Sequence, residues 1–257
     1  MMEVKKLKLY SYAVTDVGRK RSHNEDAFLR DDELGLYIVA DGMGGYAAGE
    51  VASSEAVEAV YGMIKRNKNL IEKFIYDPTQ ENAYHIQRLV ESSIQSATYF
   101  IFGMAEVMPE KHGMGTTMSV LLIAGDHGFI GQVGDSRIYK IKGDNAFQLT
   151  EDHTLINWQI KAGLLTPEQA KNSPHKNIIT RAVGSKDYVM VDTLMFPVES
   201  GDGFMLCSDG LHGYIEDNRE IVEMFNKGLE RGARAFIELA NERGGKDNIT
   251  CIFVKVV

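Results

Sequence analysis

The chain has 257 residues, 44% of them hydrophobic and 25% charged, a balance that is typical of a folded globular protein and excludes disorder or a fibrous repeat. Its formal net charge is −8, with 36 acidic and 28 basic residues, which disfavours nonspecific binding to nucleic acid or to an anionic membrane. Its two cysteines, Cys207 and Cys251, each lie inside an apolar run and do not support a disulfide framework or a cysteine-based zinc site.

The N-terminal residues include lysines but no apolar stretch of signal-peptide length, and no run approaches about 18 uncharged apolar residues. These features indicate a cytoplasmic protein with no membrane partner. No linker rich in Pro, Gly or Ser divides the sequence, and no repeat of fixed period is visible. We therefore expect residues 1–257 to form a single domain.

In chain order, the first apolar run of strand length is residues 36–40, and a helical segment follows at about residues 47–67. Within that segment Ala56, Val60 and Ile64 form an apolar stripe, so the helix should pack on one side only. A second helix is predicted over residues 83–101, where apolar residues recur at spacings of three and four.

Most of the remaining strand-like runs are rich in β-formers and bounded by Gly or Asp. They are residues 117–123, 129–133, 137–141, 204–207 and 249–256. A third helix, around Ala235 and Leu239, immediately precedes the last run. Because the helices are inserted between strand runs without alternating regularly with them, the pattern favours an α+β architecture over a doubly wound one.

Residues 151–180 differ from the rest, because the segment is polar and contains a strong helix start at Thr166-Pro167-Glu168-Gln169. Thr is a favoured N-cap, Pro suits the first helical position, and Gln three residues after the cap completes a capping box. We expect a small helical excursion from the sheet, of the kind that forms a mobile wall beside a site.

Small acidic turns recur where apolar runs stop or begin. They are Asp41-Gly42, Gly134-Asp135, Asp209-Gly210 and Lys246-Asp247-Asn248. Any one of them is explained by turn chemistry, since Asp and Gly are common turn residues. Four such turns, together with a Gly-Met-Gly-Gly loop, an Arg and an Asn-Glu-Asp turn, favour a shared site, because strand ends at one edge of a sheet can bring several carboxylates together.

Clustered carboxylates repel one another, and placing several in a partly dry cleft costs on the order of several kcal/mol unless cations lie between them. A pair of divalent ions would resolve this repulsion. Carboxylate, carbonyl and water are hard oxygen ligands, which favour Mg²⁺ or Mn²⁺ over zinc or copper, and the lack of clustered Cys and His agrees. The pattern does not separate manganese from magnesium.

In a series of short motifs, the sequence resembles the metal-dependent protein phosphatase 2C family of Ser/Thr phosphatases, in its compact bacterial form. The motifs that carry the resemblance appear in the family's order over more than 230 residues. They are Gly18-x-x-Arg21-x-x-Asn24-Glu25-Asp26, Asp41-Gly42-Met43-Gly44-Gly45 with Gly49-Glu50, Gly113-Met114-Gly115-Thr116-Thr117, Gly134-Asp135-Ser136-Arg137, Leu149-Thr150-x-Asp152-His153, Thr180-Arg181-Ala182-Val183-Gly184, Ser208-Asp209-Gly210-Leu211 and Lys246-Asp247-Asn248-Ile249-Thr250.

The resemblance implies a four-layer αββα sandwich, in which two antiparallel sheets are flanked by helices, and a phosphatase catalytic domain with a flap at about residues 151–180. It also implies roles for individual residues. Asp41 would bridge two metal ions, Gly42 would offer its carbonyl, and Asp209 and Asp247 would complete the shell of the first ion. Asp135 would hold a third, weaker ion together with Asp209.

By the same resemblance, Glu25 and Asp26 match positions that orient metal-bound waters, and Arg21 matches the residue that grips the substrate phosphate. A water or hydroxide bridging two ions would attack phosphorus in line with the leaving oxygen, without a phosphoenzyme. The alternative for Arg21 is a surface residue that only balances Glu25 or Asp26.

The acid that protonates the leaving alkoxide is left open by the sequence. Many eukaryotic family members carry a histidine directly after the Asp-Gly, and this chain has Met43 there. The remaining candidates are a metal-bound water and the side chains of His23, His153, His175 and His212.

The expected partners are phosphorylated proteins, including a Ser/Thr protein kinase and its substrates, and the expected state is a monomer. One competing hypothesis is a two-metal hydrolase of nucleotides or small phosphomonoesters. It is disfavoured because Gly42-Met43-Gly44-Gly45 is not followed by the Gly-Lys-Ser/Thr of a phosphate-binding loop. A second is an inactive regulatory domain, which is disfavoured because every expected aspartate ligand is present.

Overall fold

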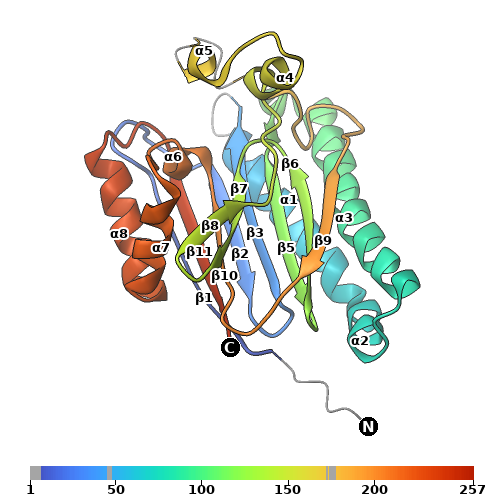
Figure 1. The fold of residues 1–257 in the computed structure, drawn as a ribbon. Helices are drawn as coiled ribbons and strands as arrows, with labels where there is room; N and C mark the ends of the chain where they lie inside the picture. Colours follow the sequence, from blue (N-terminus) through green and yellow to red (C-terminus); the bar gives the residue numbers. More distant parts are fainter. Residues whose placement is uncertain (1–6, 45–47, 172, 174–177) are drawn as a thin grey trace.

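Two antiparallel sheets form the centre of the computed structural model, which describes residues 7–44, 48–171, 173 and 178–257 (Figure 1). Sheet I has the strand order β1 (Leu9–Asp16), β11 (Ile249–Val256), β10 (Gly203–Cys207), β7 (Arg137–Lys142) and β8 (Asn145–Gln148). Sheet II has the order β2 (Asp26–Asp31), β3 (Leu36–Met43), β5 (Met118–Ala124), β6 (His127–Val133) and β9 (Asp192–Pro197), and β4 (Gly115–Thr116) pairs with β3.

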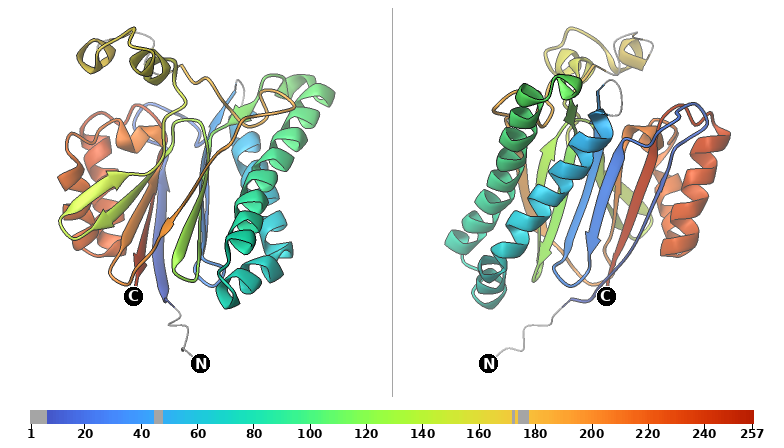
Figure 2. Two further views of the ribbon diagram at one scale, coloured as in Figure 1. Left: turned by 45° about the vertical axis from the view of Figure 1, so that its right-hand side comes forward. Right: turned by 180° about the vertical axis from the view of Figure 1, so that it is seen from behind.

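Helices cover the outer face of each sheet, which gives the four layers that the family resemblance implied (Figures 1 and 2). Sheet II is covered by α1 (Ala48–Arg66), α2 (Lys68–Tyr76) and α3 (Gln80–Val107), followed by the short 3₁₀ helix η1 (Pro109–Lys111). Sheet I is covered by α7 (Asn218–Asn226) and α8 (Leu229–Glu242), and the short α6 (Asp209–His212) follows β10. The α+β, αββα prediction is confirmed.

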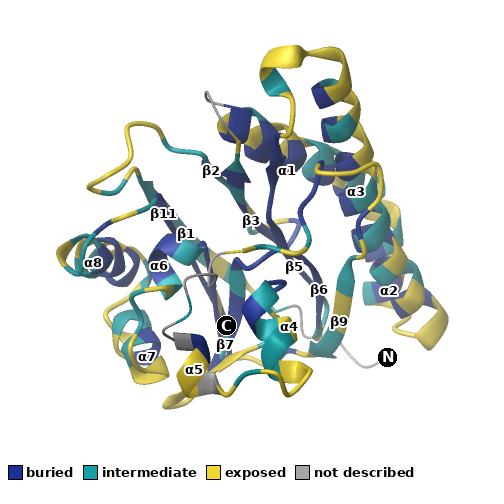
Figure 3. Cartoon of the chain, turned by 90° about the horizontal axis from the view of Figure 1, so that it is seen from above, coloured by how far each residue is buried: buried dark blue, intermediate teal, exposed yellow. Residues whose placement is uncertain are grey.

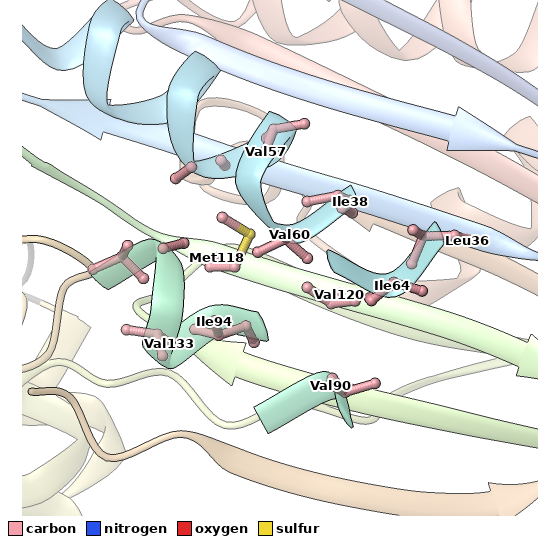
Figure 4. Packing of buried hydrophobic residues seen from close by; sticks show 14 of the residues in the cluster. Leu36, Ile38, Val57, Val60, Ile64, Val90, Ile94, Met118, Val120 and Val133 are labelled. Carbon is pink, nitrogen blue, oxygen red and sulfur yellow. The ribbon is translucent and has the colours of Figure 1, made fainter. Parts of the chain in front are cut away.

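The core consists of three apolar layers, because each sheet has two buried faces. Between sheet II and its helices, Val57, Val60 and Ile64 of α1 and Val90 and Ile94 of α3 meet the strands, as Figure 4 shows. Between the sheets lie Tyr37, Leu121, Phe204, Ile252 and their neighbours. Between sheet I and its helices lie Phe253, Phe236 and Ile221, among others. Seen from above, the buried positions follow the strands and the inner faces of the helices (Figure 3).

The predicted helices are present, with different bounds. The apolar stripe of α1 is buried as expected, and α3 extends well beyond residues 83–101 at both ends. Thr79 starts α3 by accepting a hydrogen bond from the Asn82 amide, and the helix ends just before Pro109. Helix length is therefore set here by the cap and the proline more than by the apolar stripe.

Several elements were not predicted, and they share weak apolar character. These are β1, β2, β8, β9, α2, α4 (Leu155–Lys161), α6 and α7. In β1 most positions are only partly buried, and β9 is an edge strand with several exposed positions. The pairing partners of β1 and β9 lie far away in the chain, so no local pattern marks these two strands.

We call residues 151–180 the flap segment; its helices α4 and α5 (Pro167–Lys171) stand at the upper end of the molecule in Figure 1. The predicted capping box is confirmed, because the Thr166 amide donates to Gln169 Oε1 (2.8 Å) and the Gln169 amide donates to the Thr166 hydroxyl (3.3 Å). Within the described part of the chain, no helix is long and apolar enough to cross a membrane.

Candidate metal and phosphate site

Asp41 lies within β3, where the β4–β5 segment fixes its backbone. Its amide donates to the Thr117 hydroxyl (2.8 Å), and its carbonyl accepts from the Thr117 amide (2.8 Å) and the Thr116 hydroxyl (2.9 Å). The next residue, Gly42, approaches α1 so closely that a Cβ atom there would lie 2.1 Å from the Gly49 carbonyl oxygen. A side chain at position 42 would therefore push α1 away from the Asp41 carboxylate.

Asp209 opens α6 directly after β10, with Ser208 as the cap residue. The Ser208 hydroxyl donates to Asp26 Oδ2 (2.7 Å), and the Thr250 hydroxyl donates to the same oxygen (2.6 Å). Asp26 of sheet II is thereby tied to two residues of sheet I. The buried oxygens Asp26 Oδ1 and Asp209 Oδ1 have no hydrogen-bond partner among the described residues.

Asp247 precedes β11 and faces Arg21. Arg21 Nη2 donates to Asp247 Oδ2 (2.8 Å), and Arg21 Nη1 lies 3.8 Å from Glu25 Oε2. The adjacent Asn248 holds the loop that carries Arg21, because its amide group donates to the Val17 and His23 carbonyls and its Oδ1 accepts from the Glu25 amide. Asn248 stands in one of the family motifs, but the sequence alone indicated no role for it.

Asp135 lies in the turn that crosses from β6 of sheet II to β7 of sheet I. Gly134 before it has a φ of 95°, and a Cβ atom there would lie 2.6 Å from the Thr117 side chain. His212 Nε2 donates to the Asp135 carbonyl (2.9 Å). The turn is therefore held by contacts from both sheets.

Apart from Asp26, these side chains line one cavity of about 340 Å³. Its lining consists of Arg21, Glu25, Asp41, Gly42, Met43, Gly44, Asp135, Ile179, Asp209 and Asp247. The expectation that the acidic turns lie at one edge of a single sheet is wrong, because Asp41 belongs to a strand of sheet II whereas Asp209 and Asp247 flank strands of sheet I. Two sheets packed face to face bring their strands together at a common end, which the sequence pattern alone does not reveal. Gly45, in the predicted glycine loop, lies outside the described residues.

Burial is the main reason that three carboxyl groups of this cavity, those of Asp41, Asp135 and Asp209, have raised pKa values. The pKa of Asp41 lies well above its usual value because of burial and then because of the charges of Asp26 and Asp209. Burial raises the pKa of Asp135 to about 7, and the charge of Asp209 adds to the effect. Burial and the charge of Asp247 raise the pKa of Asp209, while a hydrogen bond with the Asp41 side chain acts in the opposite direction.

This electrostatic situation fits divalent cations. Burial together with mutual repulsion disfavours ionised carboxylates, and a cation removes both penalties. The available donor atoms are carboxylate and carbonyl oxygens, which are the hard ligands that Mg²⁺ and Mn²⁺ prefer. One of them, Asp209 Oδ1, has no hydrogen-bond partner among the described residues. Among the described residues, no three His, Cys, Asp or Glu side chains are already gathered as a metal-holding group, and Arg21 is paired with Asp247. A metal ion would therefore require the Asp247 carboxylate to exchange the guanidinium for the ion.

Of the four histidines considered as the acid for the leaving alkoxide, two form hydrogen bonds with backbone groups. His212 donates to the Asp135 carbonyl, and burial lowers its pKa to about 3. His153 accepts a hydrogen bond from the Gly134 amide through Nδ1 (3.1 Å). His23 is exposed beside Arg21, and His175 lies outside the described residues.

Comparison with known proteins gives a consistent result. The sequence profile described as protein phosphatase 2C matches residues 17–242. The chain is 38% identical over 245 residues to the serine/threonine phosphatase stp of Listeria innocua, covering 94% of this chain and 93% of that protein. It is also similar to the structure of the S. agalactiae serine/threonine phosphatase, with 33% identity, a TM-score of 0.86 and coverage of 97% and 100% of the two chains.

A second similar structure bears on the metal. The catalytic domain of the serine/threonine protein phosphatase PstP, in complex with two manganese ions, is 30% identical to this chain with a TM-score of 0.83. The match covers 98% of this chain and all of that one.

Proposed function

The chain belongs to the protein phosphatase 2C family and is a metal-dependent protein serine/threonine phosphatase, and on that premise we propose that the cavity around Asp41 is its active site. The observation that carries the proposal is the convergence of Asp41, Asp135, Asp209 and Asp247, from both sheets, on one cavity with Arg21 at its side.

Asp41, the Gly42 carbonyl, Asp209 and Asp247 would hold two divalent ions. Asp135, together with Asp209, would hold a third, weaker ion. The unpartnered Asp209 Oδ1 and the raised pKa values of Asp41 and Asp135 support this assignment. When bound, such ions supply Lewis acidity, which lowers the pKa of a water molecule and neutralises phosphoryl charge.

Glu25 and Asp26 orient water at this site. Asp26 is suited to that role because Ser208 and Thr250 fix its Oδ2, which leaves Oδ1 free to accept a further hydrogen bond. The Glu25 backbone is held by Asn248 and by the Ser53 hydroxyl, which donates to the Glu25 carbonyl (2.6 Å). A fixed backbone keeps the side chain beside the cavity.

Arg21 binds the substrate phosphate. Its planar guanidinium can donate to two phosphate oxygens at once, which a lysine cannot do. Both of its carboxylate neighbours line the cavity, so it is not a surface residue remote from the site. The Arg21 guanidinium would be available to the phosphate once the Asp247 carboxylate held a cation in its place.

The substrates are phosphorylated proteins, and a Ser/Thr protein kinase and its targets are the expected partners. The protein acts as a monomer in the cytoplasm. The acidic net charge of −8 supports protein substrates over nucleic acid.

The test is a metal-dependence profile on two substrates, a phosphothreonine peptide and ATP. Activity on the peptide should vanish with a chelator, return with Mn²⁺, and fall by roughly a thousandfold or more in Asp209→Ala. Asp144→Ala, in the exposed β7–β8 turn, is the matched control and should remain active. Faster hydrolysis of ATP would favour the nucleotide hydrolase instead, and a lack of activity with Mn²⁺ present would favour an inactive regulatory domain.

A further inference from the structure

His153 connects three parts of the structure that are distant in sequence. It lies at the start of the flap segment and is buried, with 5% of its surface exposed. Its backbone amide donates to the Gly134 carbonyl (2.9 Å), and its Nδ1 accepts from the Gly134 amide (3.1 Å). One residue of the flap segment therefore binds both polar backbone groups of the glycine that precedes Asp135.

The hydrogen-bond pattern fixes the tautomer of the ring. A backbone amide can only donate, so Nδ1 carries no hydrogen, and the hydrogen of the neutral ring is on Nε2. Nε2 lies 3.0 Å from Asp192 Oδ2 at the start of β9 and donates to it. Burial, the largest cause, lowers the pKa of His153, which agrees with a neutral ring.

Arg181, which directly follows the flap segment, contacts the same aspartate as His153. Its Nη1 lies 3.1 Å from His153 Nε2, but both atoms carry hydrogens, so this contact is not a hydrogen bond. Arg181 donates instead to Asp192 Oδ1 (2.6 Å). The His153 carbonyl accepts from the Thr180 amide (2.8 Å), so the two ends of the flap segment are joined to each other and, through Asp192, to β9.

We propose that His153 is a positioning residue. It couples its own contact with Asp192 to the backbone of the Gly134–Asp135 turn. Gly134 has little freedom on its other side, because it packs on Thr117, whose hydroxyl also holds the Asp41 amide. A change in the contact between His153 and Asp192 therefore shifts the backbone that carries Asp135. The ion-binding consequence rests on the proposed role of Asp135, whereas the link itself does not.

Two amide substitutions separate the two halves of the link. The amide oxygen of His153→Asn can replace Nδ1 as the acceptor for Gly134 but does not reach Asp192. The amide nitrogen of His153→Gln can replace Nε2 as the donor to Asp192 but leaves Gly134 without its acceptor. His112→Asn and His112→Gln, at an exposed position, are the matched controls.

The primary readout is hydrogen exchange of the Gly134 amide in the metal-free protein, measured by NMR. Exchange should become roughly tenfold faster in His153→Gln and remain close to wild type in His153→Asn. Asp192→Asn, at a half-exposed position outside the cavity lining, should also speed exchange of the Gly134 amide. In the double variant with His153→Asn, Asp192→Asn should not change the Gly134 exchange rate further. That loss of additivity is the signature of transmission through the His153 ring.

The second readout is binding of Mn²⁺ at its weaker site, which should shift in His153→Gln and in Asp192→Asn but not in the His112 variants. Equal Gly134 exchange in His153→Gln and wild type, or an additive effect of Asp192→Asn in the His153→Asn background, would overturn the proposal. If His153→Gln does not fold, the Asp192→Asn result decides alone. If Asp135→Asn leaves Mn²⁺ binding unchanged, the proposed role of Asp135 fails, while Gly134 exchange still tests the link.

Discussion

At the scale of single residues, the site depends on carboxylates whose charges are unfavourable without a partner. Asp41 and Asp209 are neighbours of intermediate exposure, and Arg21 is paired with Asp247. If Arg21 binds the substrate phosphate as proposed, the Asp247 carboxylate and the phosphate compete for it. A metal ion bound to Asp247 would then favour the contact between Arg21 and the phosphate.

This competition predicts the behaviour of Arg21→Ala. The KM for a phosphothreonine peptide should rise about tenfold or more, because a charge-assisted, two-point contact with phosphate is lost. The affinity for Mn²⁺ should stay the same or increase, since a competing cation has been removed from Asp247. Steady-state kinetics and calorimetric titration with Mn²⁺ measure the two effects.

Arg21→Lys should recover only part of the phosphate affinity, because the ammonium group is a point charge. Arg88→Ala, an exposed arginine on α3, is the control for loss of one positive charge. An unchanged KM in Arg21→Ala would assign Arg21 the purely structural role.

Much of the site could be predicted residue by residue, but the residues that support it could not. Asp41, Asp135, Asp209 and Asp247 stand in short motifs, and all four line the cavity. His153, Thr117 and Asn248 act through partners far away in the chain, and nothing in their local sequence marks those contacts.

At the scale of secondary-structure elements, buried strands were predictable and half-exposed ones were not. The strands β3, β5, β6, β10 and β11 are nearly continuous apolar runs because both faces of each sheet are covered. Edge and partly exposed strands such as β1 and β9 gain their stability from pairing with distant strands, so their own composition is ambiguous.

A charged contact adds to the apolar packing that holds α7 and α8 together. Arg243, at the end of α8, donates to both carboxylate oxygens of Glu220 on α7 (2.8 and 2.9 Å) and to the Tyr214 carbonyl (2.6 Å). The hydrogen bond from Arg243 is the main reason that the pKa of Glu220 is lowered. A lowered pKa means that the ionised carboxylate stabilises the folded state.

We expect Glu220→Gln to reduce the free energy of unfolding by about 1 kcal/mol at pH 7, where the two-point contact is complete. The stabilisation is present above the unfolded glutamate pKa of about 4.3 and is lost as the pH falls through the lower pKa of the folded state. Urea unfolding of both proteins between pH 7 and pH 3 measures the difference.

The gap between wild type and Glu220→Gln should therefore close towards pH 3. Glu223→Gln, at an exposed position on the same helix, should show no such gap. A gap that stays constant with pH would mean that packing, and not the carboxylate charge, holds α7 against α8.

At the scale of the whole molecule, the proposed active-site cavity is lined by residues of both sheets. Three apolar layers hold the sheets and helices together and support the carboxylates of both sheets at a common end. A metal ion shared by Asp41 of sheet II and Asp209 of sheet I would link the sheets directly. Ion binding to the folded state alone should then stabilise the fold in proportion to the logarithm of the free ion concentration.

The central claim is that carboxylates from both sheets hold shared divalent ions, and calorimetric titration of the metal-free protein with Mn²⁺ tests it most directly. Wild type and the control Asp144→Asn should bind two ions per chain at the core site. Asp209→Asn should lose about a hundredfold or more in affinity, because an oxygen ligand with no other partner is replaced by a neutral amide. Equal binding of Mn²⁺ by Asp209→Asn and wild type would contradict the claim.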